Sequence, residues 1–196
     1  GLLSGQREPQ GWWGEARSAG WADAIEAVRV LAASMAAPID VAAASDPVFH
    51  PGRCAEIRVG DRVVGLAGEL HPRVIEATGL APRTAAFEVD LDALIAASAD
   101  VRPAPRVGTQ PLAKEDLAVV VDADVPAADV QDALAAGAGE LLESIRLFDV
   151  YEGQQVGEGR KSLAFALRFR APDRTLSAEE TAAARDAALP HLLALV

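Results

Sequence analysis

The most regular pattern in this 196-residue sequence is an alternation of side chains between residues 161 and 170. Successive side chains of a β-strand point to opposite faces of a sheet, so the alternation predicts a strand with one buried and one open face. The side chains predicted to be buried are large and apolar: Leu163, Phe165, Leu167 and Phe169. Those on the open face are small at one end and cationic at the other: Ser162, Ala164, Ala166, Arg168 and Arg170. The small ones leave room for a flat ligand to approach the backbone.

The segments around this strand predict a β-α-β-β-α order. Strands are expected at 116–121 and 145–151, and a glycine-containing hairpin loop at 152–159 joins the second strand to the third. A fourth strand is considered at 191–196, but the chain is short there, so this edge of the sheet is left open.

The two helices of this order are recognised by their ends. Pro126 opens the first helix, because proline is tolerated in a first helical turn, and Gly137 and Gly139 end it. The second helix follows a capping box, Ser177 to Glu180, and runs to about 189. Two helices on one face of an antiparallel sheet form the ferredoxin-like split βαβ fold, which belongs to the α+β class.

A proline-rich segment divides the chain. Ser98–Pro111 contains three prolines and no apolar periodicity, which is typical of an extended connector. We therefore place a linker at 99–112, between a domain at 1–98 and a domain at 113–196. The first domain is expected to mix helices and strands: a helix at 21–36, a hairpin around Gly60-Asp61, a short helix at 72–78, a strand at 87–90 and a helix at 91–97.

Composition excludes several classes of protein. With 18 basic and 29 acidic residues the net charge is −11, which excludes a globally basic nucleic-acid-binding surface but not a local one. A single cysteine cannot form an internal disulfide. No apolar run approaches the roughly 20 residues that span a bilayer, and no signal peptide is recognised, so we expect a cytoplasmic protein with no membrane partner. The absence of an initiator Met suggests a fragment of something longer.

Three side chains near the hairpin loop form a candidate site for reading a base. Asp149, Tyr151 and Ser162 offer a stacking ring, a hydrogen-bond acceptor and a hydroxyl. A carboxylate suits guanine, whose Watson–Crick edge carries two adjacent donors, and single-stranded RNA loops are read in this way. The alternative interpretation is a solvent-facing Tyr and Asp beside a loop.

The face on which these residues lie depends on the second strand. If Phe148 and Val150 are buried, Asp149 and Tyr151 lie on the open face, yet Ile145 and Leu147 share the parity of Asp149. Either a β-bulge separates the two pairs or Leu147 is partly exposed.

A local basic stripe runs through residues 160–174. It holds five cations and one acid, Asp173, within an acidic chain. The cations are candidate contacts to an RNA backbone: Arg160, Lys161, Arg168, Arg170 and Arg174.

The motifs of the second domain resemble the C-terminal anticodon-binding domain of bacterial phenylalanyl-tRNA synthetase β subunits. The resemblance is carried by Leu141–Tyr151, Gly157–Phe165 and Leu167–Leu176. The first domain resembles the end of the catalytic-like module of the same subunit. Its matching segments are Gly1–Gly5, Trp12–Trp13, His50–Ala55 and Gly65–Arg73.

This resemblance implies a fold and a set of partners. The first domain would be part of a class II synthetase-like antiparallel α+β module without catalytic motifs, and the second a ferredoxin-fold anticodon-binding domain. The family works as an (αβ)2 assembly with an α subunit that carries the chemistry and attaches phenylalanine to tRNA(Phe). ATP and Mg²⁺ would serve the complete enzyme, while this chain would hold no cofactor or metal and would be non-catalytic by itself.

The resemblance also implies residue roles. Residues at the positions of Asp149, Tyr151 and Ser162 would contact the first anticodon base, a guanine. This sequence departs from the family at Lys114-Glu115-Asp116, where many members have two arginines before the Asp, and this weakens any phosphate contact expected there.

Other residue groups are weaker candidates. His50, Cys54 and His71 lack a fourth zinc ligand and fit no compact metal motif, and a Glu69–His71 acid–base pair lacks a nucleophile. The three tryptophans, Trp12, Trp13 and Trp21, are expected in a core or, preferably, a subunit interface. The alternative functions are a stand-alone interaction module and a small-molecule-binding module, because ferredoxin-like sheets serve many roles.

Overall fold

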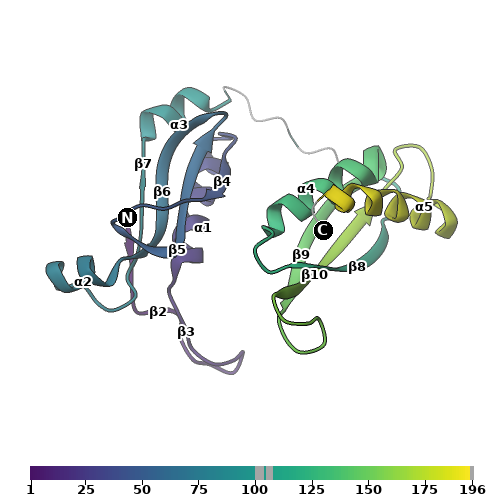
Figure 1. Ribbon diagram of the computed structural model, residues 1–196. Coiled ribbons are helices and arrows are strands. Elements are labelled where there is room, and N and C mark those ends of the chain that lie inside the picture. The colour runs from purple at the N-terminus through teal and green to yellow at the C-terminus, as the bar shows by residue number, and fades with distance from the viewer. Residues whose placement is uncertain (100–103, 105–107, 195–196) are drawn as a thin grey trace. The chain divides into compact units, whose positions relative to one another are not determined.

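The computed structural model describes residues 1–99, 104 and 108–194. The chain divides into two compact units, Gly1–Ala104 and Pro105–Val196, each with its own hydrophobic core (Figure 1). Of the predicted linker at 99–112, residues 100–103 and 105–107 lie outside the described residues.

The first unit contains a five-stranded antiparallel sheet with the order β1-β7-β6-β5-β4. Its strands are β1 (Leu2–Leu3), β4 (Asp40–Ala43), β5 (Phe49–Val59), β6 (Arg62–Leu70) and β7 (Ala85–Val89). Three helices accompany it: α1 (Trp21–Ser34), α2 (Pro72–Thr78) and α3 (Leu91–Ala97). Helix α1 runs along one face of the sheet (Figure 1).

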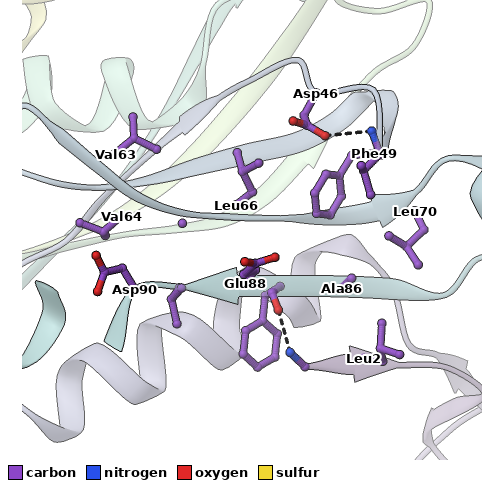
Figure 2. Close-up of a pocket in the computed structure, with 15 residues that line it drawn as sticks. Leu2, Asp46, Phe49, Val63, Val64, Leu66, Leu70, Ala86, Glu88 and Asp90 are labelled. Atoms are coloured by element: carbon purple, nitrogen blue, oxygen red, sulfur yellow. Dashed lines mark hydrogen bonds between the residues drawn. The ribbon is translucent and has the colours of Figure 1, made fainter. Parts of the chain in front are cut away.

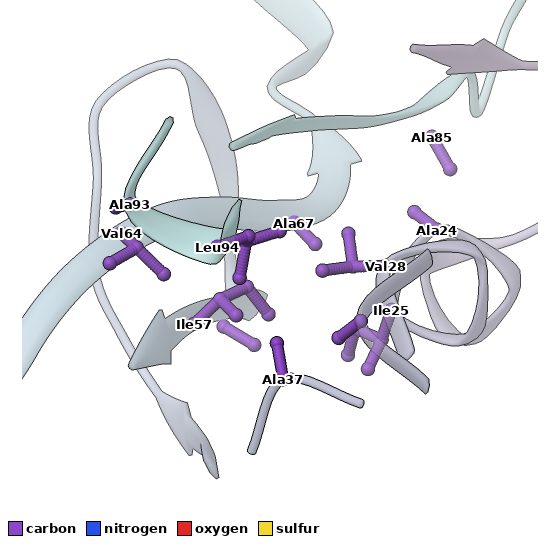
Figure 3. Packing of buried hydrophobic residues seen from close by; sticks show 12 residues of the cluster. Ala24, Ile25, Val28, Ala37, Ile57, Val64, Ala67, Ala85, Ala93 and Leu94 are labelled. Carbon is purple, nitrogen blue, oxygen red and sulfur yellow. The ribbon is translucent and has the colours of Figure 1, made fainter. Parts of the chain in front are cut away.

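The core of this unit lies between α1, α3 and the sheet. Val28 of α1 is fully buried and faces the strand residues Ala67 and Ala85, while Leu94 of α3 packs near Ile57 of β5 (Figure 3). Helix α1 forms because its apolar residues recur at helical spacing, and the resulting apolar face is the one that the sheet buries. The predicted helix at 21–36 is confirmed, except that it ends at Ser34.

Two glycines end elements as predicted. Gly60 has a φ of 55° in the turn between β5 and β6, and Gly79 has a φ of 69° after α2. Both angles lie in the left-handed region that glycine adopts without a steric cost. The predicted hairpin and the predicted short helix are therefore confirmed.

A separate two-stranded arm is formed by β2 (Gln6–Glu8) and β3 (Arg17–Ser18). Its tip carries Trp12 and Trp13, which are 94% and 59% exposed and stack edge to face with ring centroids 5.8 Å apart. Trp21 is also exposed, so a place in the core is wrong for all three tryptophans. Trp12 and Trp13 are exposed because the arm extends beyond the sheet (Figure 1), whereas Trp21 is the first residue of α1.

The second unit has the predicted β-α-β-β-α order. Its elements are β8 (Ala113–Asp122), α4 (Ala127–Ala138), β9 (Leu142–Tyr151), β10 (Arg160–Phe169) and α5 (Ala178–Ala188). The strands form an antiparallel sheet with the order β8-β10-β9, so β10 is central. The four large apolar residues of β10 are fully buried, as the alternation predicts: Leu163, Phe165, Leu167 and Phe169. This is the predicted α+β, ferredoxin-like arrangement.

The chain after α5 differs from the strand considered at 191–196. Leu189–Ala194 forms a 3₁₀ helix, and residues 195–196 lie outside the described residues. Pro190 has no amide hydrogen to donate to a ladder, and Leu192 is buried in the core, so this segment packs against α4 instead of pairing with β8. Among residues 108–194, β8 therefore has a partner on one side only.

The end of α4 also needs a correction. Gly137 lies inside the helix, and only Gly139 ends it, with a φ of 69°. A Cβ on Gly137 would lie 2.7 Å from the Cα of Ala188. This glycine therefore permits the close approach of α4 to α5 and does not terminate the helix.

None of the helices in the described residues combines the length and the apolar character that a membrane span requires.

Candidate nucleic-acid interface

A β-bulge in β9 decides which side chains reach the open face of the second sheet. Leu147 pairs with Phe165 and Asp149 pairs with Ala164, which leaves Phe148 as an extra residue between them. Both interpretations of the parity conflict hold in part: the structure contains the bulge, and Leu147 is only partly buried. It allows Leu147 to pack against the core and Asp149 to lie on the opposite face.

The expected burial of Phe148 and Val150 is wrong. Each side chain is 49% exposed. Strand β9 is an edge strand, so its side chains have a neighbouring strand on one side only. Phe148 is in addition the unpaired residue of the bulge.

The three residues proposed to read a base lie on one face. Tyr151 is the register partner of Ser162, and Asp149 is the partner of Ala164, two positions along the same face. Side chains of directly opposite residues in an antiparallel pair are neighbours, and diagonal ones remain within reach of a long or aromatic side chain. We call Asp149, Tyr151 and Ser162 the base-reading group. Tyr151 is 42% exposed. The β10 residues beside it on this face, Ser162 and Ala164, have small side chains that leave the ring accessible.

The start of the hairpin loop fixes the surroundings of the tyrosine. A Cβ on Gly153 would lie 2.5 Å from the hydroxyl oxygen of Tyr151. The ring therefore lies over the backbone of the loop, and a side chain at 153 would displace it. The absence of a side chain at Gly153 therefore permits the close approach of the tyrosine to the loop.

Four of the five cations of the basic stripe contact the protein itself. Lys161 donates to the carbonyl oxygen of Ala123 at 2.8 Å, and it has the parity of the buried residues of β10. Arg160 lies 3.8 Å from the carboxylate of Asp122. Of these two residues, Lys161 lies on the face opposite the base-reading group, and Arg160 has the parity of Ser162.

Arg170 and Arg174 are held in ion pairs. Arg170 pairs with Glu143 and donates to the carbonyl oxygen of Gly108 at 2.9 Å. Arg174 donates to Glu180 at 2.8 Å, and this hydrogen bond raises the pKa of the guanidinium above its usual value. Glu180 also accepts from the amide of Ser177 and closes the predicted capping box, which is confirmed.

Two cations missing from the predicted set lie on the open face. Lys114 of β8 is the register partner of Arg168, and Arg146 of β9 is the partner of Ala166. The parity of Lys114 with Ala118 was a signal that could have placed it on this face. Arg146 could not be placed without the bulge, because parity counted back from Tyr151 assigns it to the buried side.

The weaker candidates of the first unit do not form a reactive site. Among the described residues, no group of three or more His, Cys, Asp or Glu side chains could hold a metal ion. His71 caps α2 by accepting from the amide of Arg73 at 3.1 Å, and burial raises the pKa of the Cys54 thiol. Glu69 is buried and pairs with Arg53 at 2.8 Å instead of with His71.

A hollow in the first unit lies on the sheet and has a volume of about 690 Å³ (Figure 2). Its walls are mainly apolar, with three acids, and two of these are already used by the protein. Asp46 accepts from the amide of Val48 at 2.8 Å, and Asp90 caps α3 and pairs with Arg62. The hollow thus offers shape but no set of reacting groups, and the open face of the second sheet remains the stronger candidate site.

Two family models match the chain. Residues 1–91 match the phenylalanyl tRNA synthetase beta chain CLM domain, and residues 108–194 match the ferredoxin-fold anticodon binding domain.

Similar curated proteins carry the name phenylalanine–tRNA ligase beta subunit. The proteins from Streptomyces avermitilis and Thermobifida fusca are each 57% identical over 192 residues, which is 96% of this chain and 23% of the relative. The protein from Mycobacterium leprae is 50% identical over 190 residues, which is 97% of this chain and 22% of the relative. The chain thus spans less than a quarter of the length of these relatives. On both its domains and these relatives, it belongs to the family of phenylalanyl-tRNA synthetase β subunits.

Proposed function

We propose that the second unit binds the anticodon loop of tRNA(Phe), as part of the β subunit of a phenylalanine–tRNA ligase. The observation that carries the proposal is the register of β9 and β10, which places the base-reading group together on an open sheet face. The family supports this function over a stand-alone interaction or small-molecule module.

The base-reading group has the chemistry that a guanine requires. The ring of Tyr151 would stack on the base, which is worth about 1–3 kcal/mol per base in single-strand recognition. The carboxylate of Asp149 would accept from the two adjacent donors of the Watson–Crick edge, and the hydroxyl of Ser162 would donate or accept beside it. A carboxylate next to adenine would instead face an acceptor at that edge, so the group would favour guanine.

The first unit would serve assembly. It would pack against an α subunit within an (αβ)2 enzyme that attaches phenylalanine to tRNA in the cytoplasm. ATP and Mg²⁺ would act in the complete enzyme and outside this chain, and no catalytic residue is assigned here. The exposed Trp12 and Trp13 support an interface, since large aromatic side chains are enriched where proteins meet.

A titration tests the decoding role. The chain is titrated with tRNA(Phe) and with the same tRNA in which the first anticodon base is changed from guanine to adenine. We expect binding to the altered tRNA to be weaker by roughly 1–3 kcal/mol, equivalent to about fivefold to 150-fold. Tyr151→Ala should weaken binding of the unaltered tRNA by a similar factor. Equal binding of the two tRNAs would exclude recognition of that base.

A matched control uses a residue of the same loop. Glu158 is exposed in the hairpin loop and is not a member of the base-reading group, so Glu158→Gln should leave the preference for guanine unchanged. A loss of preference in this variant would indicate that loop disturbance, and not contact with the base, explains the Tyr151 result.

A further inference from the structure

Three cations form a row on the open face of the second sheet, beyond the base-reading group. Lys114 of β8 and Arg168 of β10 are direct register partners. Arg146 of β9 lies opposite Ala166, which is two residues nearer to Ser162 along β10 than Arg168 is. All three side chains are exposed. We call Lys114, Arg146 and Arg168 the cation row.

This row is unfavourable for the protein alone. Like charges directly opposite each other in a sheet are destabilising, and Lys114 and Arg168 are such a pair. Asp116 shares the face, opposite Ala166 and diagonal to Arg168. None of the three cations forms an ion pair in the part of the chain that the structure describes, although the whole chain carries a net charge of −11.

The contrast with the other arginines of this unit is informative. Four of them, Arg160, Arg170, Arg174 and Arg185, each lie within ion-pair distance of a carboxylate. Acidic partners are therefore abundant, but the cation row has none among residues 108–194. A row of cations that the protein leaves unneutralised on an open face fits a ligand that brings its own negative charges.

The position of the row relates that ligand to the proposed function. A strand rises about 3.3 Å per residue, so Arg146 and Arg168 lie roughly 13 and 20 Å along the sheet from Ser162. This distance is too long for contact with the base that the base-reading group holds. Phosphates of neighbouring nucleotides would lie at distances of this order if the same RNA strand ran over the sheet as an extended backbone.

We propose that the cation row binds the phosphodiester backbone of the nucleotides next to the base held by the base-reading group. The inference rests on the proposed function and adds the residues that supply affinity without sequence preference. It keeps Arg168 from the five predicted backbone contacts and adds Lys114 and Arg146, whereas the other four cations each have a contact within the protein.

The test is a salt series with the full 196-residue chain. Binding of tRNA(Phe) and of the tRNA with the altered first anticodon base is measured for Lys114→Gln, Arg146→Gln and Arg168→Gln. Each released counterion contributes to the slope of log K against log salt concentration, so each variant should reduce that slope by about 0.7 to 0.9. Affinity should fall roughly threefold to tenfold for both tRNAs alike, with the preference between them unchanged.

Arg174→Gln is the matched control, because Arg174 is a cation of the same unit that is already paired with Glu180. It should leave the salt slope unchanged. Thermal unfolding without RNA provides a second readout. Lys114→Gln should leave the midpoint unchanged or raise it, because it relieves repulsion with Arg168.

The outcomes separate the two proposals. If tRNA(Phe) binds with no preference for its first anticodon base, or does not bind, the proposed function fails. If binding and preference are intact but the three variants keep the salt slope of the unmodified chain, the cation row is excluded as the phosphate site. A variant of the row that changes the preference between the two tRNAs would also contradict the inference, because it would indicate contact with a base.

Discussion

At the scale of single residues, Asp23 shows how one carboxylate joins two elements. Its oxygens accept from both terminal nitrogens of Arg17 at 2.9 Å and from the amide of Gly20 at 2.9 Å. Arg17 also donates to Glu8 in the other strand of the arm. The base of the tryptophan-bearing arm is thus attached to the first turn of α1 through one acid.

The same residue predicts a pH dependence of stability. The hydrogen bonds from Arg17 hold the pKa of Asp23 below its ordinary value near 4. A depressed pKa contributes stability that is present above the unfolded-state value and is lost as the pH falls through the folded-state value. We expect Asp23→Asn to lower the free energy of unfolding at pH 7 by about 1 kcal/mol, because the amide loses the charge-assisted pair with Arg17 although its oxygen can still accept from Gly20.

Urea unfolding from pH 7 to pH 2 checks this expectation. The difference between the variant and the unmodified chain should shrink as the pH falls below about 4, since Asp23 of the unfolded chain is protonated first and Asp23 of the folded chain only at lower pH. Asp61→Asn, at an exposed turn position, serves as the control and should leave stability within about 0.5 kcal/mol at every pH. A difference for Asp23→Asn that stays constant down to pH 2 would contradict the assigned role of the ion pair.

At the scale of elements, strand β9 joins two halves with opposite parity. Before the bulge, Ile145 and Leu147 face the core, and after it Asp149 and Tyr151 face outward. A shift of one residue moves every following side chain to the other face of a sheet. The bulge at Phe148 therefore allows Ile145 and Leu147 to face the core while Asp149 and Tyr151, at the same sequence parity, face outward.

Two single-residue deletions test this role of the bulge. Deleting Phe148 removes only the extra residue, so Leu147 stays inward and Tyr151 stays opposite Ser162. Deleting Val150 instead makes Asp149 and Tyr151 adjacent, so one of the two must point to the buried side. We expect the first deletion to retain the preference for the unaltered tRNA and the second to abolish it, a loss of about tenfold or more. The measurement is the same titration, with circular dichroism to verify folding; equal effects of the two deletions would refute the parity argument.

At the scale of the whole molecule, the chain consists of two units with separate cores. The base-reading group, the cation row and the core beneath them all belong to the second unit. A unit of about 90 residues is within the size range of domains that fold alone. Decoding should therefore be separable from the proposed assembly role of the first unit.

This separation predicts the behaviour of the isolated second unit. A polypeptide of residues 105–196 should unfold in one cooperative transition and retain the preference for guanine at the first anticodon position. Differential scanning calorimetry and the tRNA titration check the two parts of the prediction. If this polypeptide folds cooperatively but does not discriminate the two tRNAs, residues 1–104 must contribute to recognition.

The sequence by itself predicted what depends on neighbours along the chain. Alternation in β10, the capping box at Ser177 and the glycine after α2 are local features, and each appears in the structure as expected. The recurring apolar residues of α1 likewise predicted both the helix and its buried face. The motifs of both domains were sufficient to indicate the family.

The tertiary structure alone decided what depends on residues far apart in the chain. Cross-strand pairing set the bulge at Phe148 and brought Lys114 beside Arg168, and folding brought Arg170 into an ion pair with Glu143, which is 27 residues away along the chain. The last segment became a 3₁₀ helix because Leu192 could be buried against α4. The physical reason is the same in each case: a pattern along one strand gives the parity of a side chain, whereas its partner across the sheet is fixed only when the chain has folded.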